Sequence, residues 1–353
     1  MPVDAPPSLR PIADRVERRL DEVLAPELER WAALDPDLRG PMAEIRRLVL
    51  SGGKRLRPAF CHWGYVAAGG DPADAIVADA GAAFELMHAF ALFHDDVMDD
   101  AASRRGEPTT HTVFAALHAE SAWAGESRRF GEGVAILIGD LAFVYADRLL
   151  ADANPTAWSI WNELRIELNV GQVLDIVGSV RGVRDVEQAE RICRYKSGKY
   201  TIERPLHLGA ALASPNRFAE LAPVLSDYGL PLGDAFQMRD DVMGAFGDAA
   251  ATGKPVGGDL REGKPTPLLA RAVAAATPAQ RDQLAAVGRP GLTDPEVERI
   301  QEVIVATGAL ADLEATITRR ADQAVSAITA AEIPDDARRE LVELAEFVTG
   351  RSV

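Results

Sequence analysis

Glycine and proline divide this chain into segments of helical length, and this division limits the possible folds more than any other feature. Ala, Leu, Glu and Arg, which favour helices, dominate the segments, and runs of β-branched residues are rare. Apolar side chains recur at helical spacing within them, as in the segment 11–34. The pattern therefore predicts an all-α protein.

The expected organisation is one helical domain over residues 11–353, preceded by a flexible tail at 1–10. Residues 103–132 read as loop-rich, and no composition shift or internal repeat marks a boundary. Three more helices should follow the Gly/Pro-punctuated loop 247–267, one opened by Thr293-Asp294-Pro295 and the last by Pro334-Asp335. Before that loop we expect helices at 11–34, 42–50, 72–102, 134–150, 156–178, 185–195, 199–213, 217–229 and 231–246.

Charge and cysteine content exclude several classes of function. The 54 acidic and 38 basic residues give a net charge of −16, which argues against nucleic-acid binding, because that binding needs Lys and Arg to neutralise phosphates. Cys61 and Cys193 form neither a disulfide framework nor a zinc-ligand spacing, and we expect both to be buried. No segment reads as a signal peptide or a membrane helix, and the mean hydropathy is −0.05. We therefore predict a cytoplasmic protein without a transmembrane segment.

An acidic cluster, FHDDVMDD, follows the apolar stretch AGAAFELMHAFALF. Asp95 and Asp99 are four residues apart and share one helix face, with Asp96 beside them. Such carboxylates repel one another unless a cation lies among them, and Mg²⁺ prefers oxygen ligands of this kind. A solvated acidic helix end is the alternative, but the apolar stretch places these acids at the rim of a core. The cluster therefore predicts a metal site.

A second acidic pair, Asp240 and Asp241, follows another apolar stretch in FQMRDDVMGAFGD, with Gln237 one turn earlier. Two such helices facing each other in a bundle would place carboxylates on opposite walls of one cavity. Basic residues complete the pattern and could recognise a diphosphate; each alone is better explained as a surface charge, so the prediction rests on their joint spacing. They are Lys54, Arg55, Arg104, Arg105, Lys196, Lys254 and Lys264.

Taken in order, these motifs resemble the polyprenyl synthetase family of trans-isoprenyl diphosphate synthases, over roughly residues 45–270. The matching strings are GGKRLRP, DDVMD at 95–99, RRGEPTTH, GQVLD at 171–175, YKSGKYT, QMRDDVMGAFGD, TGKP and DLREGK. The resemblance implies a homodimer of isoprenoid synthase helical bundles, each with a central active-site cavity. It also implies an Mg²⁺-dependent transferase that joins isopentenyl diphosphate head-to-tail to dimethylallyl, geranyl or farnesyl diphosphate and releases diphosphate.

The resemblance also implies roles for individual residues. Three Mg²⁺ ions on the allylic diphosphate would be bound by Asp95, Asp99 and Asp240, with Asp96 and Asp241 in support. The allylic diphosphate would be contacted by Arg104, Lys196 and Lys254, and isopentenyl diphosphate by Lys54, Arg55, His88 and Arg105. Further polar positions near substrate or metal are Gln172, Asp175, Ser197, Gln237 and Lys264. Ionisation, condensation and elimination would need no protein nucleophile.

Product length can be argued from the helix that carries the first cluster. Phe90 lies five residues before Asp95, about 7.5 Å deeper along a helix, where its ring could stop a growing chain. In the family, an aromatic residue here in a motif without a two-residue insertion suggests the twenty-carbon geranylgeranyl diphosphate, whereas a second aromatic next to it, where this chain has Ala91, favours fifteen carbons. A farnesyl or longer product remains the alternative. If Phe90 is only a core residue, Met87, Ala83 and Phe84, which lie deeper, could form the floor instead.

Two features depart from the family pattern, and three other functions are alternatives that the residues disfavour. Gly244 stands where the second motif has its third aspartate, and the segment 118–133 is longer than the family minimum. A class I terpene cyclase would lack the second Asp pair and the isopentenyl diphosphate site. A phosphohydrolase of the HD type, suggested by His94-Asp95, would need further spaced histidines. A non-catalytic subunit of a heteromeric synthase would have decayed motifs.

Overall fold

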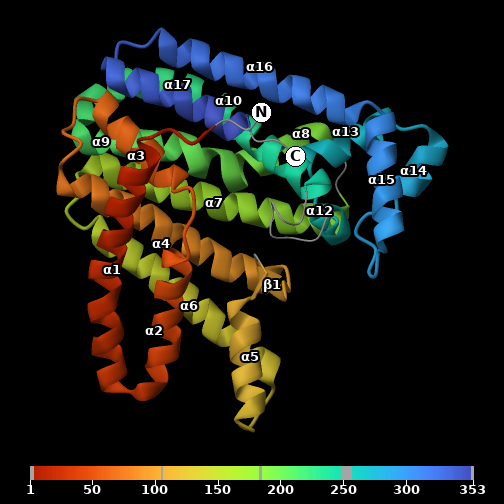
Figure 1. Ribbon diagram of the computed structural model, residues 1–353, viewed down its shortest axis with the longest axis horizontal. Coiled ribbons are helices and arrows are strands. Elements are labelled where there is room, and N and C mark those ends of the chain that lie inside the picture. Colours follow the sequence, from red (N-terminus) through yellow and green to blue (C-terminus); the bar gives the residue numbers. More distant parts are fainter. Residues whose placement is uncertain (1–3, 105, 183–184, 248–256, 351–353) are drawn as a thin grey trace. The chain divides into compact units, whose positions relative to one another are not determined.

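The computed structural model describes residues 4–104, 106–182, 185–247 and 257–350, which are almost entirely helical (Figure 1). Within these ranges the strands are β1 (Ser103–Arg104) and β2 (Glu107–Pro108), which pair antiparallel. The predicted all-α class is therefore confirmed. Backbone contacts divide the chain into two compact units. We call residues 7–62 with 71–154 the N-terminal unit, and residues 4–6 and 63–70 with the chain from 155 onward the C-terminal unit. The single domain predicted for 11–353 stays a prediction.

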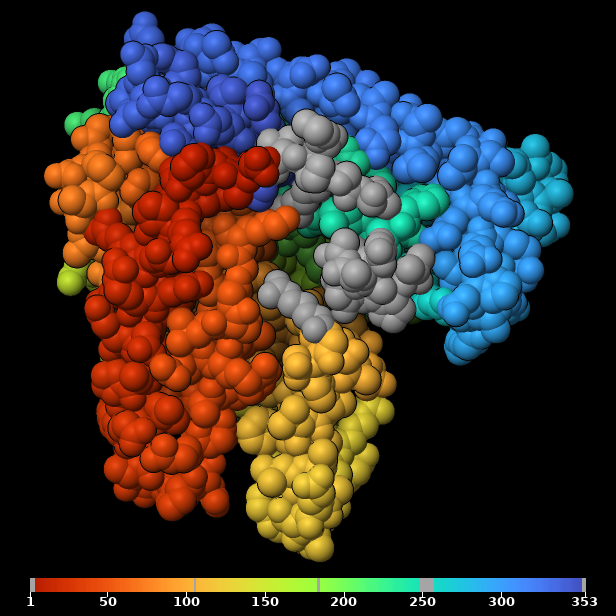
Figure 2. Space-filling model, viewed as in Figure 1, coloured from red at the N-terminus to blue at the C-terminus, as the bar shows by residue number. Residues whose placement is uncertain are grey.

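The N-terminal unit is built on a helical hairpin and three further helices. Its elements are α1 (Leu9–Leu34), the 3₁₀ helix η1 (Pro36–Leu38), α2 (Arg39–Leu50), the start of α3 (Leu56–Ala67), α4 (Ala75–Met98), β1, β2, α5 (Thr110–Glu120) and α6 (Ser127–Leu149). α4 packs against α1 and α6, and α5 packs against α6. Glu27 of α1 accepts hydrogen bonds from Tyr145 and Arg148 of α6 at 3.1 and 3.0 Å. The far ends of the α1–α2 hairpin and of α5 form separate projections (Figure 2).

Helix α4 is the core of this unit. It is long and apolar enough to cross a membrane by length and composition, but 72% of the qualifying window is buried inside the protein. A core helix passes the same test, and Phe84, Leu86 and Met87 of α4 are completely buried. Burial on all sides explains why its apolar residues show no single face.

The C-terminal unit contains the longer helices α7, α10 and α16, which run lengthwise through it (Figure 1). Asp234 of α10 joins two neighbours, since it accepts hydrogen bonds from Arg194 at 2.6 Å and from Arg320 of α16 at 2.7 Å. The elements are α7 (Pro155–Arg181), α8 (Val186–Cys193), the π-helix η2 (Arg194–Glu203), α9 (Arg204–Ala213), α10 (Pro215–Phe246), α12 (Gly258–Glu262), α13 (Pro267–Ala275), α14 (Pro278–Leu284), α15 (Asp294–Ala306), α16 (Ala309–Thr329) and α17 (Asp335–Thr349).

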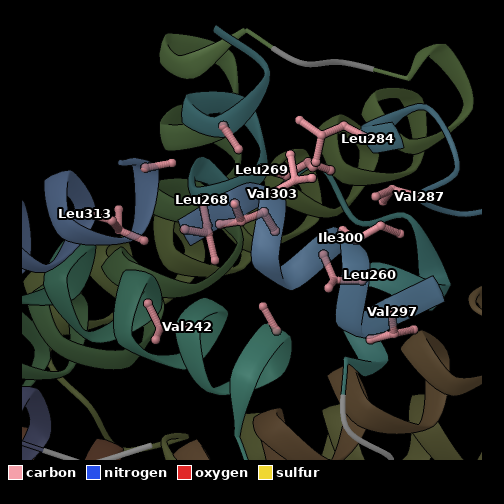
Figure 3. Packing of buried hydrophobic residues seen from close by; sticks show 14 of the residues in the cluster. Val242, Leu260, Leu268, Leu269, Leu284, Val287, Val297, Ile300, Val303 and Leu313 are labelled. Atoms are coloured by element: carbon pink, nitrogen blue, oxygen red, sulfur yellow. The ribbon is translucent and has the colours of Figure 1, made fainter. Parts of the chain in front are cut away.

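An apolar cluster joins α10, α12, α13, α15 and α16. Figure 3 shows Leu260 of α12 beside Ile300 and Val297 of α15, with Val242 contributed by α10. Leu260 is only 3% exposed. Its burial fixes the short α12, which has too few residues to be stable alone.

Three expectations about helices need correction. The segments 217–229 and 231–246 form one helix, α10, which continues through Pro223 and Pro231 although each removes a backbone hydrogen bond. Packing along α16, α9 and η2 compensates for these losses. The loop-rich stretch contains α5, whose buried face carries His111, Phe114 and His118 rather than an apolar repeat. The predicted starts of α15 and α17 are confirmed, but α12, α13 and α14 precede them.

Candidate active site

The first acidic cluster lies where α4 ends, in the N-terminal unit. Asp99 caps the helix and donates its backbone N–H to the carbonyl of Asp95 at 2.8 Å. Asp96 is 7% exposed, whereas Asp99 is exposed. The cluster therefore extends from the edge of the core into solvent, as the apolar stretch before it predicts.

Arg104 of β1 compensates the charge of this cluster. Its Nε and Nη2 donate to Oδ1 of Asp96 at 2.9 and 2.7 Å, and Nη2 lies 3.7 Å from Oδ2 of Asp95. Burial alone would lower the pKa of Arg104, but the hydrogen bond and charge of Asp96, with the charge of Asp95, outweigh it and raise this pKa. Arg104 thus stays cationic beside the carboxylates. The predicted ligand Arg105 lies outside the described residues.

The other predicted positions of α4 lie before the cluster. His88 is partly buried and lies two turns before Asp95 on the same helix face. Phe90 makes edge-to-face contacts with His94 and with Phe143 of α6, at centroid distances of 4.7 and 4.8 Å. Met87 is completely buried and Ala91 is half-buried. Aromatic packing from α6 therefore fixes the Phe90 ring.

His94 has a structural role in this fold. Its Nε2 lies 2.9 Å from the carbonyl oxygen of Ile136 in α6, and Gly139 leaves room for its ring. His94 therefore has a structural explanation that does not involve the phosphohydrolase suggested by the His94-Asp95 string.

The loop between α2 and α3 carries the predicted isopentenyl diphosphate ligands. Gly52 and Gly53 have φ of +88° and +145°, which favour glycine. Lys54 is exposed, but Arg55 is buried and its guanidinium contacts Glu17 and Glu85. The two adjacent cationic residues therefore have different surroundings: Lys54 faces solvent, and Arg55 is buried beside two carboxylates.

The second acidic cluster lies near the end of α10, in the C-terminal unit. Asp241 is 5% exposed and accepts hydrogen bonds from Gln237 at 3.0 Å and from Cys193 Sγ at 3.7 Å. Burial, with the nearby charges of Asp259 and Asp240, raises the pKa of Asp241 to about 8. A cation among these carboxylates would favour the ionised form, so the pair is suited to a metal. Asp240 is partly buried.

The π-helix η2 positions the second group of cationic residues. Lys196 of η2 donates to Oδ2 of Asp175 in α7 at 2.5 Å. A side chain at Gly171 of α7 would overlap the backbone at Lys196, and the backbone of Gly198 closely approaches that of Gly233 in α10. Glycines therefore let η2 approach both helices. The polar residues Gln172 and Ser197 belong to these same elements and are partly buried.

Gly244 has a steric reason to be glycine. A Cβ at this position would overlap the carboxylate of Asp259 in α12. Lys264 Nζ lies 3.8 Å from Oδ1 of Asp259 and 2.7 Å from Oε2 of Glu262. The carboxylate of Asp259 thus fills the space that the side chain of an aspartate at position 244 would need. Lys254 lies outside the described residues.

These contacts place the predicted residues in two groups, one in each unit. Arg104 joins Asp95 and Asp96, whereas Lys196 joins Asp175 and Gln237 joins Asp241. Among the described residues, no three His, Cys, Asp or Glu side chains gather closely enough to hold a metal alone. Carboxylates in ones and twos suit Mg²⁺, which completes its shell with water and substrate phosphates.

Sequence reasoning missed two residues of these groups. Asp259 lies within the quoted string DLREGK, so its motif position is a signal for it. Glu85 stands alone in the apolar stretch before the first cluster and is 6% exposed. A lone carboxylate in an apolar helix signals a buried ionic partner, since such groups are seldom buried unpaired.

Comparison with known proteins identifies the family. The family model described as "Polyprenyl synthetase" matches residues 42–305. A geranylfarnesyl diphosphate synthase from Aeropyrum pernix is 32% identical over 306 residues, 84% of this chain and 89% of the relative. A geranylgeranyl diphosphate synthase from Mycobacterium tuberculosis is 32% identical over 308 residues, covering 85% of this chain and 81% of the relative.

Solved structures agree with this assignment. A crystal structure of geranylgeranyl pyrophosphate synthase from Corynebacterium glutamicum, complexed with isoprenyl diphosphate and magnesium, superposes with a TM-score of 0.89. The two sequences are 37% identical, and the match covers 97% of this chain and 99% of that one. The family match includes both acidic clusters and the elements that carry them. The chain therefore belongs to the polyprenyl synthetase family.

Proposed function

We propose that this protein is an Mg²⁺-dependent isoprenyl diphosphate synthase that condenses isopentenyl diphosphate with allylic diphosphates. The observation that carries the proposal is the pairing of Asp95 and Asp96 with Arg104, inside a family match that also includes Asp240 and Asp241. Carboxylates that hold Mg²⁺, beside a fixed guanidinium, are the groups needed to bind and stabilise a diphosphate leaving group.

Each group of residues has a part in this reaction. The metal, held by Asp95, Asp99 and Asp240 with support from Asp96 and Asp241, would neutralise the leaving diphosphate. Arg104, Lys196 and Lys254 would bind the same diphosphate and add fixed positive charge. Lys54, His88 and Arg105 would hold isopentenyl diphosphate, and Gln172, Asp175, Ser197, Gln237 and Lys264 would orient these groups. Loss of a proton to the departing diphosphate would complete the condensation.

Geranylgeranyl diphosphate is the proposed product. The edge-to-face contact between Phe90 and Phe143 fixes an aromatic ring about 7.5 Å before Asp95 along α4. A ring held in this way resists displacement by a growing chain, whereas Ala91 beside it leaves space. We propose that three Mg²⁺ ions are bound when substrate is present.

A homodimer is the proposed assembly. Exposed apolar side chains form a stripe along α7, spaced so that they share one face of the helix. They are Ile166, Val170, Val173, Ile176 and Val180. The opposite face of α7 is buried and includes Ile160, Trp161 and Leu164. An apolar stripe of this length suits a second copy of the chain, and the exposed residues Ile136, Leu137 and Val144 of α6 have the same character.

A reducing, cytoplasmic compartment is proposed from the two cysteines. Cys61 and Cys193 are both free and buried, as predicted.

The test is direct. Purified protein with Mg²⁺, isopentenyl diphosphate and each allylic primer in turn should release diphosphate and form prenyl diphosphates, separated by chain length. A terpene cyclase would instead convert an allylic diphosphate alone into a hydrocarbon or alcohol. A non-catalytic subunit would give no product with any primer, and either outcome would contradict the proposal.

A further inference from the structure

The loop between α2 and α3 carries two adjacent cationic residues that differ in burial. Lys54 is exposed, whereas Arg55 is 5% exposed. Arg55 has a left-handed backbone with φ of +48°, and its carbonyl accepts the N–H of Ala59 at 3.0 Å in the first turn of α3. This conformation is strained for a residue with a side chain, so the surrounding contacts must hold it in place.

Three helices supply those contacts. The Nη2 of Arg55 donates to the carbonyl oxygen of Val49 in the last turn of α2 at 2.5 Å. Its Nε and Nη2 donate to Oε1 of Glu17 in α1 at 3.1 and 2.9 Å. Its Nη1 donates to Oε2 of Glu85 in α4. One guanidinium therefore joins the loop to α1, α2 and α4.

This environment does not suit a diphosphate ligand. All three nitrogens of the Arg55 guanidinium already donate to protein oxygens, and its side chain is 3% exposed. The carboxylates of Glu17 and Glu85 would also repel a diphosphate that approached it. Glu85 lies one helical turn before His88 on α4. The Arg55–Glu85 pair thus links the loop that carries Lys54 to the helix that carries His88.

We propose that Arg55 is a positioning residue for isopentenyl diphosphate: through Glu85 and Glu17 it fixes Lys54 relative to His88 without touching the substrate. The inference rests on the proposed function. It replaces the direct contact that the family resemblance implies for Arg55. A carboxylate such as Glu85 would not itself contact a diphosphate. Through Arg55, however, Glu85 contributes indirectly to the binding of this anion.

The test compares Arg55→Gln and Glu85→Gln with a matched control. Arg46→Gln removes a similar ion pair between α2 and α1, because Arg46 lies 2.6 Å from Asp21, but this pair is solvent-exposed. Both Arg55→Gln and Glu85→Gln should raise the KM for isopentenyl diphosphate about tenfold or more, since a small misplacement of a binding group has large effects. The KM for the allylic diphosphate should stay within about twofold, and Arg46→Gln should change neither constant.

A direct contact would give a different result. If Arg55 binds the diphosphate, Glu85→Gln should leave the KM for isopentenyl diphosphate unchanged or lower it, because it removes a negative charge. That result would overturn the proposal. The double variant should be no worse than the worse single variant if both residues act through one link. If the increases in KM of the two single variants multiply in the double variant, the proposal is also contradicted. Glu17→Gln, which removes a half-exposed partner, is the milder variant if the others fold poorly.

A measurement without turnover separates this inference from the proposed function. Amide hydrogen exchange over residues 52–59 should be faster in Arg55→Gln and Glu85→Gln than in the wild type and in Arg46→Gln. Unchanged exchange would overturn the positioning role. Inactive wild-type protein with accelerated exchange in the variants would reject the proposed function and keep the link between loop and helix.

Discussion

The carboxylate of Asp259 lies over Gly244, in the space that any side chain at position 244 would need. Gly244 belongs to α10, whereas Asp259 belongs to α12, which Leu260 fixes in the apolar cluster of Figure 3. The missing third aspartate of the second motif is thus linked to a carboxylate that reaches the same place from another helix. This relationship makes the effect of restoring the motif predictable.

Gly244→Asp should damage the protein although it restores the family pattern. The new side chain would displace Asp259 and add a negative charge beside Asp241, at a cost of about 1–3 kcal/mol in unfolding free energy. Denaturant unfolding and turnover would measure it. Gly133→Ala is the control, because Gly133 is an exposed helical position with open space around it. Adding Asp259→Ala to Gly244→Asp should recover part of the loss, and a fully stable single variant would contradict the steric account.

Removal of the metal or of its proposed ligands should abolish condensation. Excess chelator should stop turnover, and added Mg²⁺ should restore it. Asp95→Ala and Asp240→Ala should each lower kcat/KM by about two or more orders of magnitude, because they remove groups that act on the leaving diphosphate. Asp152→Asn, on an exposed residue outside both clusters, is the matched control. Either variant with near-normal kcat/KM would remove that residue from the site.

Product length should depend on the aromatic pair of α4 and α6. Phe90→Ala should lengthen the products, and Phe143→Ala should shift them in the same direction, because Phe143 fixes the Phe90 ring. Ala91→Phe should shorten them. Chromatography of the dephosphorylated products measures each distribution, and an unchanged distribution in Phe90→Ala would place the floor elsewhere on α4.

The apolar stripe of α7 should control assembly. Val173→Glu places a charge in its middle and should convert the dimer to monomer, as measured by sedimentation or light scattering. Val305→Glu makes the same change at an exposed position of α15 and should leave the mass unchanged. If the wild type is already monomeric, the proposed homodimer is rejected.

Acid should destabilise the protein partly through His207. Burial, with the charges of Arg204 and Lys199, lowers the pKa of His207 to about 3 in the folded state, whereas an unfolded histidine takes up a proton near pH 6.5. The unfolded state therefore binds more protons between these values, so stability falls as the pH drops from about 6.5 toward 3, by about 1.4 kcal/mol per unit at most. His207→Gln should lose less stability than the wild type between pH 7 and 5. Equal losses in denaturant unfolding would contradict the assignment.

Much of this fold could be predicted because helix signals here are local. The start at Asp294 follows from the capping box of Thr293 and Glu296, and the start at Asp335 follows from Pro334 and the acidic first turn; both predicted starts are confirmed. The errors arose where tertiary packing decides the outcome. The break expected between residues 229 and 231 is absent, because neighbouring helices sustain α10 through Pro231 as they do through Pro223. Helix α5 was missed because its buried face is formed by histidine, threonine and phenylalanine.

The sequence could predict which residues belong to the candidate site, but it could not predict which of them contact one another. The spacing of Asp95, Asp96 and Asp99 on one helix face follows from the sequence. That Arg104 reaches Asp96 depends on the β1–β2 turn, which no periodicity reveals. The position of Asp259 depends on long-range packing of α12 through Leu260, so it could not be inferred from spacing alone.

The π-helix η2 limits how this chain could change in length. Its hydrogen bonds span one residue more than those of an α-helix, so deleting a single residue would let it revert to ordinary helix. The side chains on either side of the deletion would then rotate relative to one another, and Lys196 would leave Asp175. Loops elsewhere can absorb insertions and deletions, but this segment requires a fixed number of residues. Variation in related chains should therefore alter side chains within η2 while its length stays constant.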